Sequence, residues 1–91
     1  MRYRTMTADK QRAGMQALLE CTLQAEKDKG CQIAQIRYSD IAREEWAKGL
    51  TRKQALALAR FELRHGRWAI LTPHSSVERS FLGADFTYRE A

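Results

Sequence analysis

The stretch from Ser39 to Arg67 decides the fold: SDIAREEWAKGLTRKQALALARFELRHGR. Ser39 or Asp40 predicts the start of a helix, because a short side-chain oxygen can accept from the free N–H groups of a first turn. Gly49 predicts its end, since glycine takes the left-handed conformation that closes many helices. The stretch therefore opens with one helix over residues 39–48.

A second helix begins almost at once. Thr51 and Gln54 have the spacing of a capping box, in which each side chain accepts from the backbone N–H of the other residue. This start follows the end of the first helix within about three residues, and a joint that short with a glycine in it predicts two helices that cross at a steep angle.

The second helix has an apolar side and a cationic side. Six apolar residues at helical spacing predict its buried face: these are Ala55, Leu56, Leu58, Ala59, Phe61 and Leu63. Four residues follow one line along the other side: these are Lys53, Ala57, Arg60 and Arg64. Arg52 lies beside the start of that line. Lysine and arginine are also good helix formers that can simply solvate an exposed face, but the arrangement as a whole suits a DNA groove.

The chain before this pair predicts a long first helix over about residues 8–29. Thr7 opens it, Gly30 stops it, and residues 1–6 form either a short edge strand or a frayed end. An apolar stripe at helical spacing predicts its buried face: this stripe is Met15, Leu18, Leu19, Thr22 and Leu23. Residues 31–36 are too short a segment to decide between strand and helix.

The chain after the pair changes from helical to strand periodicity. Residues 67–72 are rich in strand formers and stop at Pro73. A polar loop follows, and residues 81–82 and 86–88 are candidate strands separated by a turn. We therefore expect a β-hairpin over about residues 67–89, within a single α+β domain that is mostly helical.

Composition fits one basic domain. The 91 residues carry a formal net charge of +5. Between Thr51 and Arg79 there are six Lys and Arg against two Glu, so +4 of this charge lies in under a third of the chain. Such a concentration predicts an acidic partner, most simply nucleic acid.

Two cysteines, Cys21 and Cys31, are present, and no secretory signal precedes them. Cys21 falls in an apolar helical pattern, where a free cysteine behaves as a small apolar residue. We therefore expect reduced thiols in a cytoplasmic protein. No apolar run approaches the length that spans a membrane.

Trp46 has two interpretations. The first is a core anchor that buries on the order of 150–250 Å². The second is a platform on which a nucleobase stacks, although such platforms usually lie in open grooves. We expect the first.

Catalytic and metal-binding patterns are not apparent. His65 and His74 lie across a glycine break and far from the cysteines, so no zinc spacing matches. His74, Ser75 and Ser76 are neighbours in a loop without an orienting acid, and the sequence has no glycine-rich phosphate loop. We expect no enzymatic activity, no metal and no cofactor.

The order of these elements resembles that of winged helix-turn-helix DNA-binding domains. The resemblance covers roughly Ile33 to Tyr88. It rests on the element order, the Gly49 joint, the capping box and the Gly66 break before Trp68, and it is a likeness to the class rather than to one family.

Domains of this class usually place the second helix of the pair in the major groove and the wing loop near the minor groove or backbone. The resemblance also implies a wing that contains His74, Ser75 and Ser76. The implied DNA-binding residues are Thr51, Arg52, Lys53, Arg60, Arg64, Arg67 and Arg79.

Two functions fit this sequence. The first is a small DNA-binding repressor or accessory factor that reads duplex DNA with helix 52–65, plausibly as a homodimer because single units bind weakly. The second is a protein-binding inhibitor or adaptor of the kind that phages and mobile elements encode. Its cations would pair with carboxylates of a protein partner.

Overall fold

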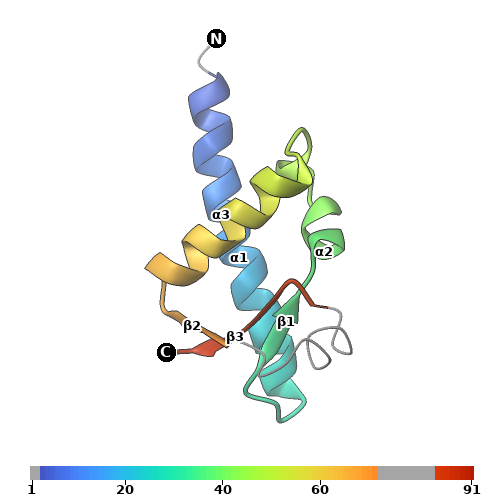
Figure 1. Cartoon of the computed structure of the whole chain (residues 1–91), viewed down its shortest axis with the longest axis vertical. Helices are drawn as coiled ribbons and strands as arrows, with labels where there is room; N and C mark the ends of the chain where they lie inside the picture. Colours follow the sequence, from blue (N-terminus) through green and yellow to red (C-terminus); the bar gives the residue numbers. More distant parts are fainter. Residues whose placement is uncertain (1–2, 72–83) are drawn as a thin grey trace.

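The computed structural model describes residues 3–71 and 84–91, with side chains from Ala8 onward. The fold is α+β, as expected (Figure 1). Its elements in chain order are α1 (Tyr3–Asp28), β1 (Ala34–Ile36), α2 (Tyr38–Ala42), the 3-10 helix η1 (Glu45–Ala47), α3 (Arg52–His65), β2 (Trp68–Leu71) and β3 (Phe86–Glu90). The predicted loop with His74, Ser75, Ser76 and Arg79, and the candidate strand 81–82, lie outside the described residues.

The three strands form one antiparallel sheet in the order β1-β3-β2. The predicted hairpin pairing is confirmed, since Trp68 of β2 lies opposite Glu90 of β3. Residues 31–36, which the sequence left open, contain β1, and Ile36 lies opposite Phe86. Helix α1 packs against β1 and α3 packs against β2. The C-terminal strand β3 therefore lies between β1, which precedes the helix pair, and β2, which follows it.

Helices α1 and α3 and the sheet enclose the core. The stripe predicted on α1 is largely confirmed: Met15, Leu19 and Leu23 are buried and Leu18 packs against them. Tyr88 of β3 is fully buried and donates its hydroxyl to the Leu19 carbonyl at 2.7 Å. Cys21 is exposed, contrary to expectation, because it lies between the stripe positions on the outer side of α1.

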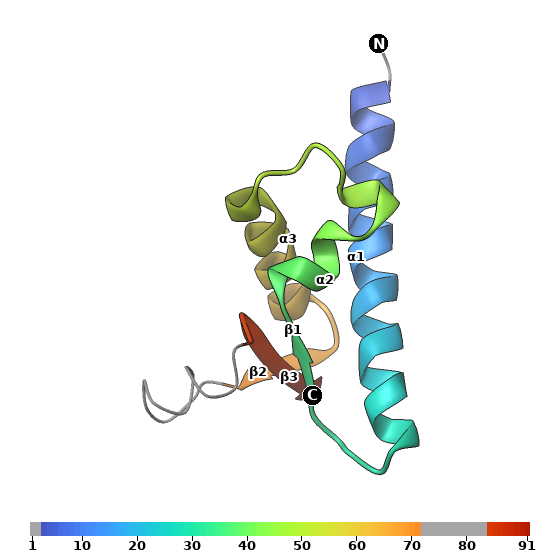
Figure 2. The same cartoon turned by 90° about the vertical axis from the view of Figure 1, so that its right-hand side faces the viewer.

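The bounds of α1 differ from the prediction at its start. The helix begins at Tyr3 instead of near Thr7, so the expected edge strand or frayed end over residues 1–6 is wrong from Tyr3 onward. The predicted stop is confirmed, since Gly30 has a φ of 89°. The first turns of α1 extend beyond the rest of the molecule (Figure 2). No helix in the described part of the chain is long and apolar enough to cross a membrane.

The single helix predicted over residues 39–48 is wrong. Helix α2 ends at Ala42, and the separate 3-10 helix η1 follows. The start also moves: Arg37 takes the N-cap position, and its N–H donates to the Asp40 carboxylate at 3.0 Å. The joint before α3 is therefore not about three residues but the whole of residues 43–51.

The break has a physical reason in packing. In one continuous helix at 3.6 residues per turn, Trp46 would lie roughly 140° around the axis from Ile41. The break instead allows Ile41 and Ala47 to be buried and Trp46 to be half-buried against α1. Gly49 takes a φ of 92° after this turn, as predicted.

The indole of Trp46 packs directly on Gly14 of α1. A Cβ at Gly14 would lie 2.5 Å from Cγ, Cδ1 and Cε2 of the indole, well inside van der Waals contact. Residue 14 must therefore be glycine for Trp46 to lie where it does. The sequence reading of Trp46 as an anchor is consistent with this contact, but its partner was not identified.

We predict that Gly14→Ala destabilises the fold by about 1–3 kcal/mol through overpacking. This exceeds the roughly 0.5–1 kcal/mol that alanine gains over glycine in a helix interior. In a Trp46→Ala background the same substitution becomes stabilising, because the clash is gone. Urea unfolding of the four proteins measures both values, and equal effects in the two backgrounds would contradict the packing argument.

The Tyr88 phenol predicts a specific alkaline instability. Burial raises the pKa of Tyr88, because the phenolate would lose its hydration. An unfolded tyrosine titrates near pH 10, so between there and the raised pKa only the unfolded state releases the proton. The stability that Tyr88 contributes is therefore complete below about pH 10 and falls as pH rises above it.

Tyr88→Phe should remove this part of the alkaline loss. At neutral pH the variant should be less stable by about 1 kcal/mol, since it lacks the hydrogen bond to Leu19. Free energies of unfolding on either side of about pH 10 give both quantities. A variant whose stability falls with pH as steeply as the parent's would refute the role of this phenol.

Candidate nucleic-acid interface

Helix α3 begins at the capping box that the sequence predicts. The Gln54 N–H donates to the Thr51 hydroxyl at 3.1 Å, and the Thr51 N–H donates to the Gln54 side-chain carbonyl at 2.9 Å. Two of the free N–H groups at the helix start are thus satisfied within the chain. The helix ends at His65, and the Gly66 N–H donates to the Glu62 carbonyl.

The buried face of α3 is narrower than predicted. Ala55, Ala59 and Leu63 are buried as expected, and Leu56 and Leu58 are half-buried. Phe61 does not widen this face: it is 43% exposed. Its ring lies 4.4 Å from the His65 ring, centroid to centroid, and the Arg12 guanidinium lies 5.2 Å from its centroid.

A charged residue completes the buried face in place of Phe61. The side chain of Glu62 is only 3% exposed. Its two carboxylate oxygens accept from Arg12 Nε at 2.9 Å and from Gln16 Nε2 at 2.8 Å, both on α1. A buried carboxylate is tolerated when it is paired and hydrogen-bonded in this way. Helical spacing with Ala55 and Ala59 was the available signal for its position.

The row Lys53, Ala57, Arg60 and Arg64, called the cation row from here on, lies on the opposite side of α3, and all four residues are exposed. The Arg60 guanidinium lies 5.7 Å from the Phe86 ring centroid on β3. Lys53 and Arg64 have no ion-pair partner among the described residues. Like Arg60, they are therefore available to a ligand without breaking a described salt bridge.

Arg52 stands at the start of α3 in a different environment. Its guanidinium lies 3.3 Å from the Asp85 carboxylate and 5.4 Å from the Tyr38 ring centroid. The other oxygen of Asp85 accepts the Tyr38 N–H at 2.7 Å. Asp85 thus links the start of β3 to α2 and α3, a role that its position in a predicted turn did not reveal.

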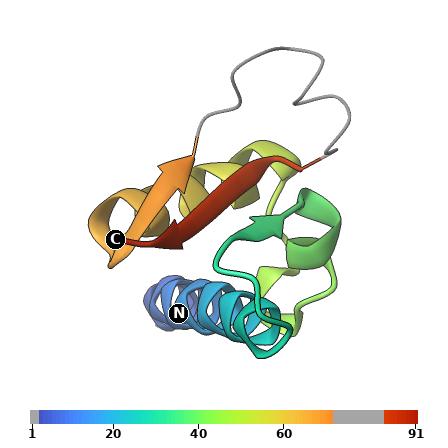
Figure 3. The same cartoon turned by 90° about the horizontal axis from the view of Figure 1, so that it is seen from below.

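The remaining predicted site residues lie apart from the row. Arg67 contacts α1: its guanidinium is 3.3 Å from the Glu20 carboxylate and 5.8 Å from the Trp68 ring centroid. Arg79 lies outside the described residues. The structure therefore brings together Thr51, Arg52 and the cation row along α3, whereas Arg67, which follows α3, pairs with α1. Figure 3 shows α1 nearly end-on, with β2 and β3 side by side next to it.

Comparison with protein-family models, curated proteins and solved structures finds no match to this chain. The site must therefore be interpreted from its own chemistry. Within residues 3–71 and 84–91, no group of three or more His, Cys, Asp or Glu could hold a metal ion. The chemistry of the α3 surface is that of exposed guanidinium and ammonium groups around one small alanine.

We predict that Glu62→Ala destabilises the protein by about 1–3 kcal/mol, because two hydrogen bonds to a charged carboxylate that link α1 to α3 are lost. Glu45→Ala is the matched control: the Glu45 side chain is 87% exposed, and its one ion pair within the described residues is with Lys48. Its effect should stay below about 0.5 kcal/mol. Thermal or urea unfolding distinguishes the two variants, and equal effects would refute the linking role of Glu62.

Proposed function

We propose that this protein binds duplex DNA through the exposed side of α3. The observation that carries the proposal is the placement of the one acidic residue of α3. Glu62 is buried against Arg12 and Gln16. The outward surface of α3 therefore contains the cation row and no carboxylate of its own. Such a helix face is electrostatically complementary to a phosphate-lined groove.

The arrangement of the elements supports a winged helix-turn-helix as the framework. A strand precedes the helical segments, α3 follows them, and β2 and β3 form an antiparallel pair after α3. In this proposal α3 enters the major groove, and the wing loop that the sequence predicts lies outside the described residues. The long joint over residues 43–51 makes the turn larger than a minimal one.

Each cation has a distinct expected role. Lys53 and Arg64 are free to contact bases or phosphates, and Arg60 lies between them on the same line. Arg52 is held by Asp85 at the N-terminal end of α3, where a phosphate is also favoured by the helix dipole. Ala57 leaves room for the groove floor to approach the helix.

The salt dependence of duplex binding tests the proposal. The logarithm of the association constant should fall with the logarithm of salt concentration, with a slope of about −0.9 for each phosphate contact. Lys53→Ala and Arg64→Ala should each weaken binding and, where the residue contacts phosphate, reduce the slope by about 0.9. Lys29→Ala is the control, since Lys29 lies beyond the far end of α1 and pairs with Glu26.

Fluorescence anisotropy with a labelled random duplex at several salt concentrations gives these slopes. Failure to bind at low salt, or equal effects of Lys29→Ala and Arg64→Ala, would overturn the proposal. Selection from a random duplex pool would then show whether the protein acts as a sequence-specific repressor or accessory factor. A two-fold symmetric motif would indicate a homodimer. The two free, exposed cysteines fit a reducing compartment, and we place this function in the cytoplasm.

A second function is favoured by one observation, the exposed Phe61. Phe61 is 43% exposed beside the Arg12 guanidinium, and exposed aromatic and arginine side chains are enriched in protein-protein contacts. In this alternative the cation row pairs with carboxylates of a protein partner, as an inhibitor or adaptor would. A partner retained on the immobilised protein after nuclease treatment, and lost with Phe61→Ala, would favour this function over DNA binding.

A further inference from the structure

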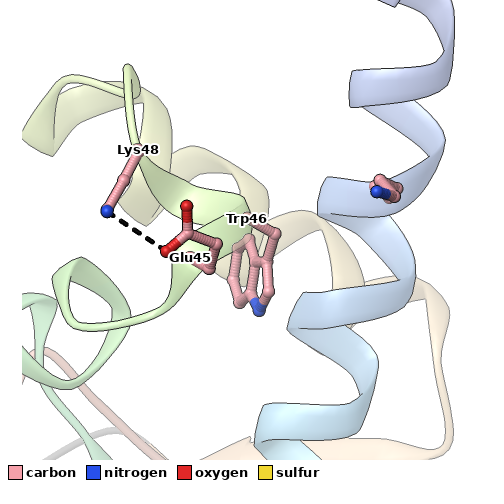
Figure 4. A pocket seen from close by; sticks show the side chains of 4 residues that line it. Glu45, Trp46 and Lys48 are labelled. Carbon is pink, nitrogen blue, oxygen red and sulfur yellow. Dashed lines mark ion pairs between the residues drawn. The ribbon is translucent and has the colours of Figure 1, made fainter.

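A cavity beside Trp46 lies away from the cation row. Its volume is about 440 Å³, and it is lined by Lys10 of α1 together with Glu45, Trp46 and Lys48 (Figure 4). Cavities of roughly 300–1,000 Å³ are typical of small-molecule sites. The cavity lies where η1 meets α1, so its walls come from segments far apart in the sequence.

One wall of the cavity is aromatic. A Cβ at Gly14 would be equally close to Cγ, Cδ1 and Cε2 of Trp46, at 2.5 Å from each. These three atoms belong to the five-membered ring. A point equally far from all three lies on the axis of that ring, so Gly14 lies over one face of the indole and not at its edge. Trp46 is half-buried and lines the cavity, so the part of the indole that Gly14 does not cover supplies this wall.

Among the described residues that line the cavity, one positive charge is uncompensated, which is that of Lys10. Lys48 Nζ lies 3.1 Å from a Glu45 carboxylate oxygen, and this pair cancels its own charge (Figure 4). Lys10 is exposed and has no ion-pair partner among the described residues. An anion could therefore approach Lys10 without displacing a described salt bridge.

We infer that this cavity binds a small aromatic anion. A flat ring would stack on the free face of the Trp46 indole, in the offset geometry that aromatic pairs favour. A carboxylate or phosphate on that ring would accept a charge-assisted hydrogen bond from Lys10. Both parts are required, because an exposed lysine alone holds an anion weakly in water.

The two tryptophans provide the measurement. Trp46 and Trp68 each give one indole N–H signal in a ¹⁵N–¹H NMR spectrum, and Trp46→Phe assigns them. Trp68 is 7% exposed in the core and reports any general effect on the fold. The probes are indole-3-acetate, an aromatic carboxylate, and adenosine monophosphate, an aromatic phosphate. Benzyl alcohol supplies a ring without charge, and inorganic phosphate supplies charge without a ring.

At least one aromatic anion should shift the Trp46 signal saturably and leave the Trp68 signal in place. Saturation by indole-3-acetate alone identifies a carboxylate ligand, and saturation by adenosine monophosphate alone identifies a nucleotide. Benzyl alcohol and inorganic phosphate should bind at least about tenfold more weakly. No saturable shift with either aromatic anion, or equal binding of benzyl alcohol, would overturn the inference.

A pair of lysine variants separates this site from the proposed DNA surface. Lys10→Ala should lower the affinity for the aromatic anion by about tenfold, which is the scale of one charge-assisted hydrogen bond. Lys53→Ala should leave its affinity unchanged, because Lys53 lies on the cation row. An aromatic anion that binds Lys10→Ala as tightly as the parent would refute the site. No DNA is present in this experiment, so its result is independent of the proposed function.

Discussion

The buried carboxylate of Glu62 fixes how α3 is rotated in the fold. A carboxylate can leave water only where donors replace its hydration, and Arg12 and Gln16 supply those donors from neighbouring turns of α1. Rotating α3 about its axis would separate Glu62 from both donors and leave a charge buried without partners. The constraint acts on one side of the helix, but it also determines what the other side presents.

The cations of the described residues therefore fall into two groups, those paired with carboxylates and those left unpaired. Arg12, Arg52 and Arg67 each pair with a carboxylate from a distant part of the sequence, so they link separate segments of the fold. Lys53 and Arg64 lie on the far side of α3, without ion-pair partners in the described part of the chain. Pairing of these arginines elsewhere thus leaves Lys53 and Arg64, among the described residues, as unpaired cations on one surface of α3.

A second contact positions the start of α3. Trp46 lies over Gly14 of α1, and the chain must leave α2 after Ala42 to bring it there. The segment over residues 43–51 is therefore shaped by this packing and not by a continuous helix. Since that segment ends at the Thr51 cap, the seat of the tryptophan and the orientation of α3 are linked through α1.

The sequence by itself determined the features that depend only on residues close together in the chain. The Thr51–Gln54 box, the apolar stripe of α1 and the left-handed Gly30 and Gly49 follow from spacing and backbone preference, and all four are present. The row of Lys53, Arg60 and Arg64 is exposed as its period predicts. Strand periodicity also located β2 and β3, although not the residues they oppose.

Contacts between distant residues could be decided only by the tertiary structure. The sequence favoured one helix over residues 39–48, because local backbone preferences do not include the packing of Trp46 on Gly14, which is distant in the sequence. It placed Phe61 inside and overlooked Glu62, since hydrophobicity ranks a carboxylate as an outside residue unless its donors on α1 are known. It grouped Arg67 with the cation row, whereas Glu20 holds Arg67 beside α1. Periodicity thus determined which side of α3 is apolar, and long-range pairing determined which charges remain available.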